Sequence, residues 1–248
     1  MTETSLDPRF VNVDPLREVY RESIVATPER FHRDHMERAA LLCIDLQYLD
    51  AARGYGVFED AEKSGVPIEA QEYYFDQLDR IVIPNVRRLQ ACFRRHGLEV
   101  IHIRIQSLTR DGRDRSSGHK RLGLHAAPGS KDAEFLEPVA PKGDEIVINK
   151  TTSGAFTSTI LAYVLSNLDI RAIYVAGVYT DECISTTVRD ACDLGYFTTL
   201  VSDGCTTVTP QRQEFTIGSL KDRYVRVVET SAIVTEIGSR LPAEGRTS

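Results

Sequence analysis

From Ala39 onward, short apolar runs alternate with longer segments in which apolar residues recur at helical spacing. Strands of a buried parallel sheet read as nearly continuous apolar runs, so this alternation is typical of a parallel sheet covered by helices on both faces. We therefore predict a three-layer α/β fold with a Rossmann-like, doubly wound sheet. The pattern predicts six strands, at residues 40–44, 99–105, 145–148, 172–176, 197–201 and 225–228.

Four helices are predicted between these strands. The first follows an apolar pattern from Leu78 to Phe93 and stops at Gly97. Pro84 interrupts this pattern, which leaves two alternatives, a kinked helix or a helix that begins at the proline. The other three helices are predicted at about residues 155–167, after Cys183, and at about residues 211–220.

The ends of the chain differ from this alternating region. Residues 1–38 are polar, contain three prolines and show one weak helical stretch, at 15–22. They predict an N-terminal arm, which packs either on its own domain or on a neighbouring subunit. With 248 residues and 42% hydrophobic content, the chain can bury the core of one α/β domain or two small ones. We place this domain at residues 39–240, with a C-terminal tail at 241–248.

Composition narrows the class of partner. The formal net charge is −6, the pI is about 5.6, and both signs of charge are mixed along the chain. Nucleic acid is therefore not an expected partner, and a small molecule is. No apolar run approaches the roughly 20 residues that span a bilayer, so we expect no membrane contact and a cytoplasmic protein. In a reducing compartment the five cysteines are expected to be thiols.

One of these cysteines lies at a predicted strand–turn–helix junction. Cys183 ends the segment Gly177-Val-Tyr-Thr-Asp-Glu-Cys183, which follows an apolar run and precedes a helical pattern. A helix N-terminus favours a thiolate and can bind an oxyanion, so Cys183 is the predicted nucleophile. Asp181 and Glu182 oppose a neighbouring thiolate, and we therefore expect a separate cation at the site.

Two further polar residues are predicted at the same edge of the sheet, because the carboxyl ends of parallel strands meet there. Asp45 ends the first strand, and Lys150 follows the third. Taken singly, the aspartate reads as a cap and the lysine as a solvated strand end. Together with Cys183 they supply a nucleophile, a proton acceptor and a cation, the set that covalent attack on an amide requires.

Other candidate sites are weaker. The six histidines form no zinc pattern, the glycine-rich phosphate fingerprints are missing, and no cofactor or metal is predicted. The arginine-rich stretch from Arg104 to Arg121 is interrupted by Asp111 and Asp114. It reads as a solvated loop, with recognition of an acidic substrate group as the alternative. The remaining cysteines are predicted to be packed or surface thiols, namely Cys43, Cys92, Cys192 and Cys205.

Three segments in order resemble the isochorismatase-like cysteine hydrolases over about residues 39–238. These are Cys43-Ile-Asp-Leu-Gln47, Asn149-Lys-Thr-Thr-Ser-Gly-Ala-Phe156 and the segment ending at Cys183. The family includes nicotinamidases, N-carbamoylsarcosine amidases, ureidoacrylate amidases and biuret hydrolases. Further positions that fit the resemblance are Thr187, Asp190, Ala191, Gly195, Tyr196 and Asp203.

The resemblance implies a catalytic triad of Asp45, Lys150 and Cys183 in a six-stranded parallel sheet flanked by helices. It also implies a cis peptide bond between Val178 and Tyr179, and an oxyanion hole formed by the backbone N–H groups of Tyr179 and Cys183. Relatives commonly form dimers or tetramers, so a homo-oligomer is expected.

Departures from the family pattern bear on the substrate. Where nicotinamidases have an Asp-x-His metal motif, this chain reads His102-Ile-Arg-Ile-Gln-Ser107. Many relatives have an aromatic residue at the position of Asp50. We expect a small amide or ureido substrate, cleaved at its C–N bond through a thioester with release of ammonia or an amine. Candidate substrate contacts are Tyr48, Arg104, Gln106 and Tyr179.

Three alternatives stay open at this point. Isochorismatases proper hydrolyse a vinyl ether with the same fold, but they lack the cysteine nucleophile. A catalytically silent interaction protein would keep the fold and use the N-terminal arm for binding. A redox sensor would form a reversible disulfide among the five thiols.

Overall fold

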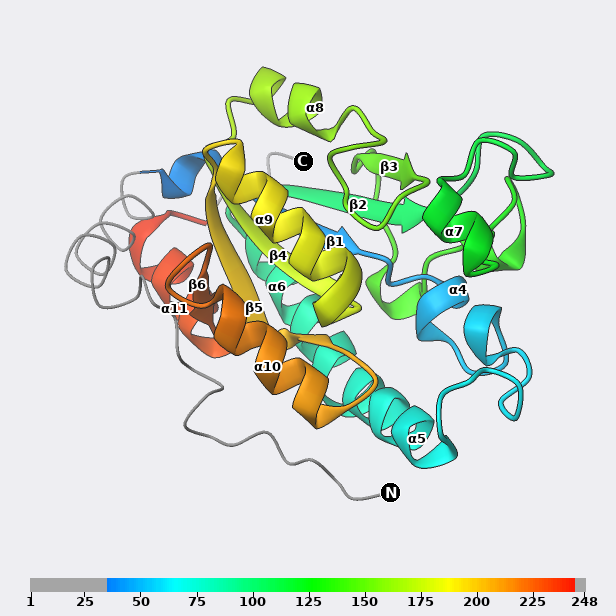
Figure 1. Ribbon diagram of the computed structural model, residues 1–248. Coiled ribbons are helices and arrows are strands. Elements are labelled where there is room, and N and C mark those ends of the chain that lie inside the picture. The colour runs from blue at the N-terminus through cyan, green and yellow to red at the C-terminus, as the bar shows by residue number, and fades with distance from the viewer. Residues whose placement is uncertain (1–34, 244–248) are drawn as a thin grey trace.

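The computed structural model describes residues 35–243. The weak helical stretch predicted at 15–22 and most of the predicted arm and tail lie outside the described residues. Six strands form one sheet in which every pairing is parallel, in the order β3-β2-β1-β4-β5-β6 (Figure 1). Their bounds are β1 Ala39–Ile44, β2 Glu99–Ile105, β3 Val147–Lys150, β4 Ala172–Val178, β5 Phe197–Thr206 and β6 Arg226–Val228.

The sequence predicts all six strands, with differences at their ends. The strand expected at 145–148 lies at Val147–Lys150, so Lys150 is its last residue instead of following it. Strand β5 continues to Thr206, five residues beyond its predicted end, and its pairing with β4 shifts register between Val175 and Gly177.

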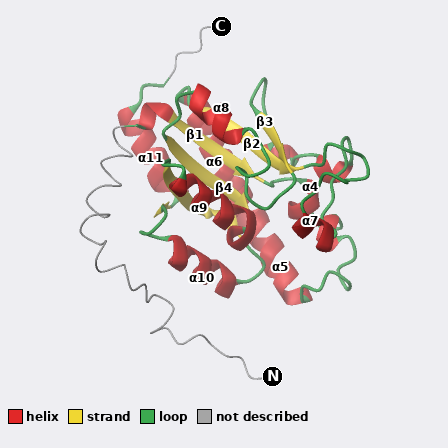
Figure 2. Cartoon of the chain, turned by 45° about the horizontal axis from the view of Figure 1, so that its top comes forward, coloured by secondary structure: helices red, strands yellow, loops and turns green. Residues whose placement is uncertain are grey.

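Helices cover both faces of the sheet (Figure 2). One face carries α5 Ile68–Gln77, α6 Ile83–Arg95 and α11 Thr230–Arg240, and the other carries α8 Leu161–Asn167, α9 Ser185–Asp193 and α10 Pro210–Leu220. Every residue of β1 is buried, and alternate side chains enter the two cores, with Leu41 and Cys43 in one and Leu42 and Ile44 in the other. The period of two in a strand produces this division.

Two short helices lie beyond the carboxyl ends of the strands, α4 Tyr48–Ala51 and α7 Ser117–Arg121. Neither was predicted, and α5 and α11 were not predicted either. The helix predicted at 78–93 is part of a longer helical segment, in which a π-helical turn, Leu78–Val82, joins α5 to α6. Val82 and Ile83 are themselves helical, so the helical segment does not begin at Pro84, and the departure from α-helical geometry is the π-helical turn directly before it.

The strand order reverses between β1 and β4, and in open α/β sheets ligands bind at such a switch point. Gly177 lies on β4 directly opposite Ile44 of β1, with a φ of 131°. A Cβ at this position would lie 1.9 Å from the Ile44 carbonyl oxygen, so only glycine fits. No helix within residues 35–243 is long and apolar enough to cross a membrane.

Candidate active site

Asp45 leaves the end of β1 in a left-handed backbone conformation, with a φ of 54°. Its N–H donates to the Ile103 carbonyl at 2.8 Å, which keeps the turn against β2. Gln47, two residues on, is fully buried. Its side-chain amide donates to the carbonyls of Ile105 and Asp132 and accepts the Ile105 N–H at 2.6 Å. These bonds fix the chain just after β1, and with it the direction in which Asp45 leaves the strand.

Lys150, at the end of β3, contacts both of the other predicted catalytic residues, Asp45 and Cys183. Its Nζ lies 2.8 Å from Asp45 Oδ2 and donates to Cys183 Sγ at 3.3 Å and to the Thr152 carbonyl at 3.0 Å. The side chain of Lys150 has no exposed surface, Asp45 retains 1% and Cys183 6%. The structure thus brings the three residues into direct contact within a buried group.

The peptide bond between Val178 and Tyr179 is cis. The segment that follows is a π-helical turn, Thr180–Ile184, which leads into α9. Cys183 is therefore in the last turn before α9, not at a plain α-helical N-terminus. Thr187 Oγ1 donates to the Cys183 carbonyl at 2.6 Å and accepts the Ala155 N–H at 3.1 Å, which ties the loop after Lys150 to the helix after Cys183.

Burial and the neighbouring charges together set the pKa values of the three groups. Burial raises the pKa of the Cys183 thiol well above its ordinary value, against the opposing effect of the Lys150 charge. Burial also raises the pKa of Asp45, again opposed by Lys150. Burial disfavours the charge of Lys150, but Asp45 and Cys183 outweigh it and raise the lysine pKa. Burial thus opposes the thiolate that a helix N-terminus favours, because desolvation of the thiol exceeds the effect of the nearby cation.

The acidic residues beside Cys183 have a cation of their own. Arg212, from α10, forms ion pairs with Asp181 and with Glu182, the latter at 3.6 Å. Thr207 Oγ1 also donates to Asp181. The expected separate cation is thus present twice, as Lys150 at the thiol and as Arg212 at the two carboxylates. No sequence pattern pointed to Arg212, which lies 29 residues beyond Cys183 on a predicted helix.

The predicted substrate contacts lie in different settings. Tyr48 packs on the ring of Tyr55, and Lys131 Nζ lies 3.9 Å from the centre of the Tyr48 ring. The N–H of Gln106 donates to the Lys150 carbonyl at 3.1 Å, so this residue stands beside the end of β3. Tyr179 is partly buried, and its hydroxyl donates to the Asp50 carbonyl at 3.1 Å.

Arg104 is held by protein atoms. Its Nε donates to Asn149 Oδ1 at 2.8 Å and its Nη1 to the Ala133 carbonyl at 2.7 Å. Its guanidinium also lies over the ring of Phe135, 5.1 Å from the centre. These contacts join β2 to β3 and to the chain at 133–135, and they hold the guanidinium against the protein through Nε and Nη1.

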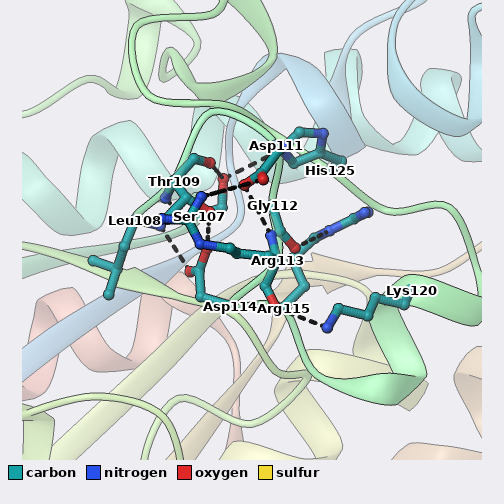
Figure 3. Close-up of polar contacts among 10 residues, drawn as sticks. All are labelled: Ser107, Leu108, Thr109, Asp111, Gly112, Arg113, Asp114, Arg115, Lys120 and His125. Atoms are coloured by element: carbon teal, nitrogen blue, oxygen red, sulfur yellow. Dashed lines mark hydrogen bonds and ion pairs between the residues drawn. The ribbon is translucent and has the colours of Figure 1, made fainter.

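The loop at 107–125 is folded on itself (Figure 3). Asp114 accepts hydrogen bonds from the N–H groups of Leu108 and Thr109 and from the Thr109 hydroxyl. Arg115 donates to the carbonyls of Gly112 and Leu124. Both charged residues thus hold the loop together, and the exposed arginines around them fit the solvated-loop interpretation.

Two buried polar residues near the triad carried no functional prediction, Asp50 on α4 and His119 on α7. Each is 2% exposed. Asp50 Oδ2 and both ring nitrogens of His119 have no hydrogen-bond partner in the protein. A sequence signal existed only for Asp50, at a position where many relatives have an aromatic residue. Nothing marked His119, because burial of a histidine in a polar loop depends on how that loop folds.

His102, at the position of the metal motif in nicotinamidases, is buried and bound to another residue. Its Nε2 lies 2.9 Å from Glu145 Oε2. Within residues 35–243, no three His, Cys, Asp or Glu side chains are grouped so that they could hold a metal ion.

The order of the strands in the sheet and the helices on both faces agree with one family of hydrolases. The isochorismatase domain model matches residues 39–232, and the chain belongs to the isochorismatase family. It is thus a hydrolase of a family in which some members act on amides or ureido compounds.

Three relatives illustrate this similarity. A ureidoacrylate amidohydrolase of Acinetobacter baylyi is 25% identical over 170 residues, which cover 62% of this chain and 69% of the relative. An N-carbamoylsarcosine amidase of an Arthrobacter species is 27% identical over 161 residues, 62% of this chain and 60% of the relative. The crystal structure of an isochorismatase family protein from Desulfovibrio vulgaris superposes with a TM-score of 0.66, at 24% identity, over 79% of this chain and 96% of the other. This last similarity supports the fold.

Proposed function

We propose that the protein is a cysteine-dependent amidohydrolase that cleaves a C–N bond of a small amide or ureido compound. The observation that carries this proposal is the position of Lys150 Nζ, 2.8 Å from the Asp45 carboxylate and 3.3 Å from the Cys183 sulfur. A buried ammonium between an acid and a thiol stabilises the charge that forms when the proton leaves the sulfur. The amide and ureido activities of two relatives support the same substrate class.

The first step transfers the thiol proton to Asp45 as the sulfur attacks the substrate carbonyl. Because burial raises the pKa of Asp45, this carboxylate accepts a proton more readily than an ordinary aspartate does. Lys150 offsets the negative charge while the C–S bond forms. The thiol thus needs activation only in the presence of substrate, in agreement with its raised pKa.

The tetrahedral oxyanion is assigned to the backbone N–H groups of Tyr179 and Cys183, the pair that the resemblance implies. Loss of one such donor typically costs about 10²–10³ in rate. Protonated Asp45 then gives its proton to the leaving nitrogen as the C–N bond breaks, and ammonia or an amine departs. Water attacks the thioester, Asp45 takes a proton from it, and the thiol is restored with release of the acid product.

We also propose that residues 39–240 form the hydrolase domain. Two of the three alternatives predict a different outcome in an activity assay, and the third, a redox sensor, predicts a reversible disulfide instead. A vinyl-ether hydrolase would not depend on Cys183, and a silent interaction protein would release no product from any substrate.

The test is ammonia release from a panel of small primary amides and ureido compounds, with wild type and Cys183→Ala. We expect turnover by wild type and a loss of at least about 10³-fold in the variant. Cys205→Ala is the matched control, because Cys205 is another buried thiol, at 3% exposure, with a raised pKa and no contact to Lys150. It should keep wild-type turnover. Retained turnover in Cys183→Ala, with an unchanged melting temperature, would remove the covalent mechanism.

A further inference from the structure

Asp50 and His119 present buried polar atoms that the protein leaves without hydrogen-bond partners. An unpaired buried donor or acceptor costs about 1–3 kcal/mol, so such atoms are rare in folded proteins. They are expected where a ligand supplies the missing partner. The two residues are 69 positions apart in the sequence, so only the fold brings them to the same region.

Both residues belong to the carboxyl edge of the sheet, where the triad lies. Helices α4 and α7 lie side by side there, in two views that differ by a rotation (Figures 1 and 2). At the start of α7, the Ser116 N–H donates to the Thr151 carbonyl at 3.0 Å, one residue beyond Lys150. On α4, the Asp50 carbonyl accepts the hydroxyls of Tyr74 at 2.7 Å and of Tyr179 at 3.1 Å.

The electrostatic surroundings of both residues agree with this location. Burial raises the pKa of Asp50 well above its ordinary value, the charge of Asp45 raises it further, and Lys150 opposes both. Burial, followed by the charge of Lys150, lowers the pKa of His119 to about 4. Near pH 7 the imidazole is therefore neutral and offers one N–H donor and one acceptor nitrogen.

We propose that Asp50 and His119 recognise the substrate through its N–H groups, and that the site selects neutral, N–H-bearing substrates over those that carry a carboxylate. The assignment rests on the proposed function and specifies its substrate class. An oxygen of Asp50 and the acceptor nitrogen of His119 can each take an N–H from a ureido or amide group. The carbonyl of the same group would face the N–H groups near Cys183.

Selection against a carboxylate follows from the cations around the site. Lys150 is paired with Asp45, and Arg212 is paired with Asp181 and Glu182. Arg104 and Arg115 donate to protein oxygens, as described above. A substrate carboxylate would thus enter a buried region beside two acidic side chains, where it would compete with protein oxygens for the nearest described cations. Burial of a charge without a partner of its own is strongly unfavourable.

The experiment uses a matched pair of probes, 2-ureidoacetamide and ureidoacetate, which share the ureido group and differ only in a terminal amide or carboxylate. Binding is measured by calorimetry with full-length Cys183→Ala, so that turnover does not interfere. We expect the amide to bind at least about tenfold more tightly than the carboxylate, the effect of one good hydrogen bond to a polar group together with the avoided charge burial.

Second substitutions added to Cys183→Ala show which residues cause the difference in affinity between the two probes. Asp50→Asn should narrow the gap between the two probes to less than about threefold, because the asparagine amide can donate to a carboxylate. His119→Ala should weaken 2-ureidoacetamide about fivefold or more, and His119→Gln, which keeps a donor and an acceptor, should restore part of the affinity. Asp190→Asn is the control, since Asp190 also has an unpartnered Oδ2 but its pKa responds to burial and Asp193, not to the triad.

Equal affinities for the two probes, tighter binding of ureidoacetate, or no binding of either would overturn the assignment. An unchanged gap in Asp50→Asn, with a melting temperature near that of the parent, would do the same. Failure of the proposed function would give a different result. In that case Cys183→Ala would bind 2-ureidoacetamide, but wild type would release no ammonia from it.

Discussion

Two groups of charged side chains lie at opposite ends of β3, and they have similar chemistry but different environments. The first is the triad, in which Asp45 has one cationic partner, Lys150. The second lies at the other end of β3, where Glu145 meets Arg94 and His102. Each combines a carboxylate, a cation and a third titratable group, and each includes a buried side chain.

Glu145 is saturated with hydrogen bonds. Arg94 donates from Nε to Oε1 at 2.6 Å and from Nη2 to Oε2 at 2.9 Å, and the Lys142 N–H donates to Oε2 at 2.9 Å. His102 Nε2 lies 2.9 Å from the same oxygen. Burial alone would raise the pKa of Glu145, but Arg94 and the other donors outweigh it and lower the pKa.

The difference between the two carboxylates separates a structural contact from a reactive one. Two hydrogen bonds from the Arg94 guanidinium stabilise the ionised form of Glu145, so this carboxylate does not take up a proton near neutral pH. Asp45 is more deeply buried and has fewer donors, and its pKa is raised. A carboxylate that can take up a proton is the one suited to deprotonate a thiol.

The largest expected effect that tests this comparison is on turnover. Asp45→Asn removes the proton acceptor, and we expect kcat/KM for ammonia release to fall by about 10²–10⁴-fold. Glu145→Gln is the matched change in the second group, and it should leave kcat/KM within about threefold of wild type. Equal losses in both variants would show that the two carboxylates do not differ in role.

The next largest expected effect is on the free energy of unfolding, when the cation of each group, Lys150 or Arg94, is removed. Lys150→Met leaves Asp45 buried without its cation, and loss of one partner of a buried pair costs about 3–5 kcal/mol. Arg94→Met should cost less, about 1–2 kcal/mol, because Glu145 keeps two other hydrogen bonds and more solvent contact. The free energy of unfolding from urea titrations measures both.

A different ranking would be informative. If Arg94→Met destabilised the fold as much as Lys150→Met, the exposure of its side chain, 23%, would not screen the pair as argued. A loss of turnover in Arg94→Met at unchanged stability would place the second group in the reaction.

Strand ends were the part of the site that sequence could predict. Asp45 and Lys150 stand at the ends of apolar runs, and parallel strands bring such ends to one edge whatever the order of the strands.

The start of one helix was predicted less well, since the helix predicted from residue 155 begins only at Leu161. The hydroxyls of Thr152 and Ser158 explain the difference, because they form hydrogen bonds in place of a helical turn. They bond to each other, the Thr152 hydroxyl donates to the Gly154 carbonyl, and the Ser158 hydroxyl accepts the Thr151 N–H.

What sequence could not predict depends on burial. The raised pKa of Cys183 follows from surroundings that many distant segments provide, so the local helix signal indicated the opposite direction. Arg104 illustrates the same limit, because its contacts with Asn149 and Ala133 form only after β2 and β3 pair. Patterns along the chain predict which residues reach an edge, and the tertiary packing decides which of their polar atoms stay free.

The smallest predicted effect concerns pH and the third member of the second group, His102. Burial lowers the pKa of this imidazole from its ordinary 6.5, and Glu145 only partly opposes the shift. Below pH 6.5 the unfolded chain therefore binds more protons at His102 than the folded protein does, and folding loses stability as the pH falls. His102→Gln removes this loss. It also removes one donor that lowers the pKa of Glu145. That effect has the same sign but acts only near and below the ordinary glutamate pKa of 4.5, so His102 dominates above pH 5.

We accordingly expect the free energy of unfolding of wild type, minus that of His102→Gln, to decrease as the pH is lowered from 7.5 to 5, at no more than about 1.4 kcal/mol per pH unit for one proton. Urea titrations at each pH give the difference directly. An increase on acidification would mean that the folded state protonates His102 more readily than the unfolded chain does. This result would require Glu145 to outweigh burial, and it would make His102 and Glu145 a second charged pair beside that of Arg94 and Glu145.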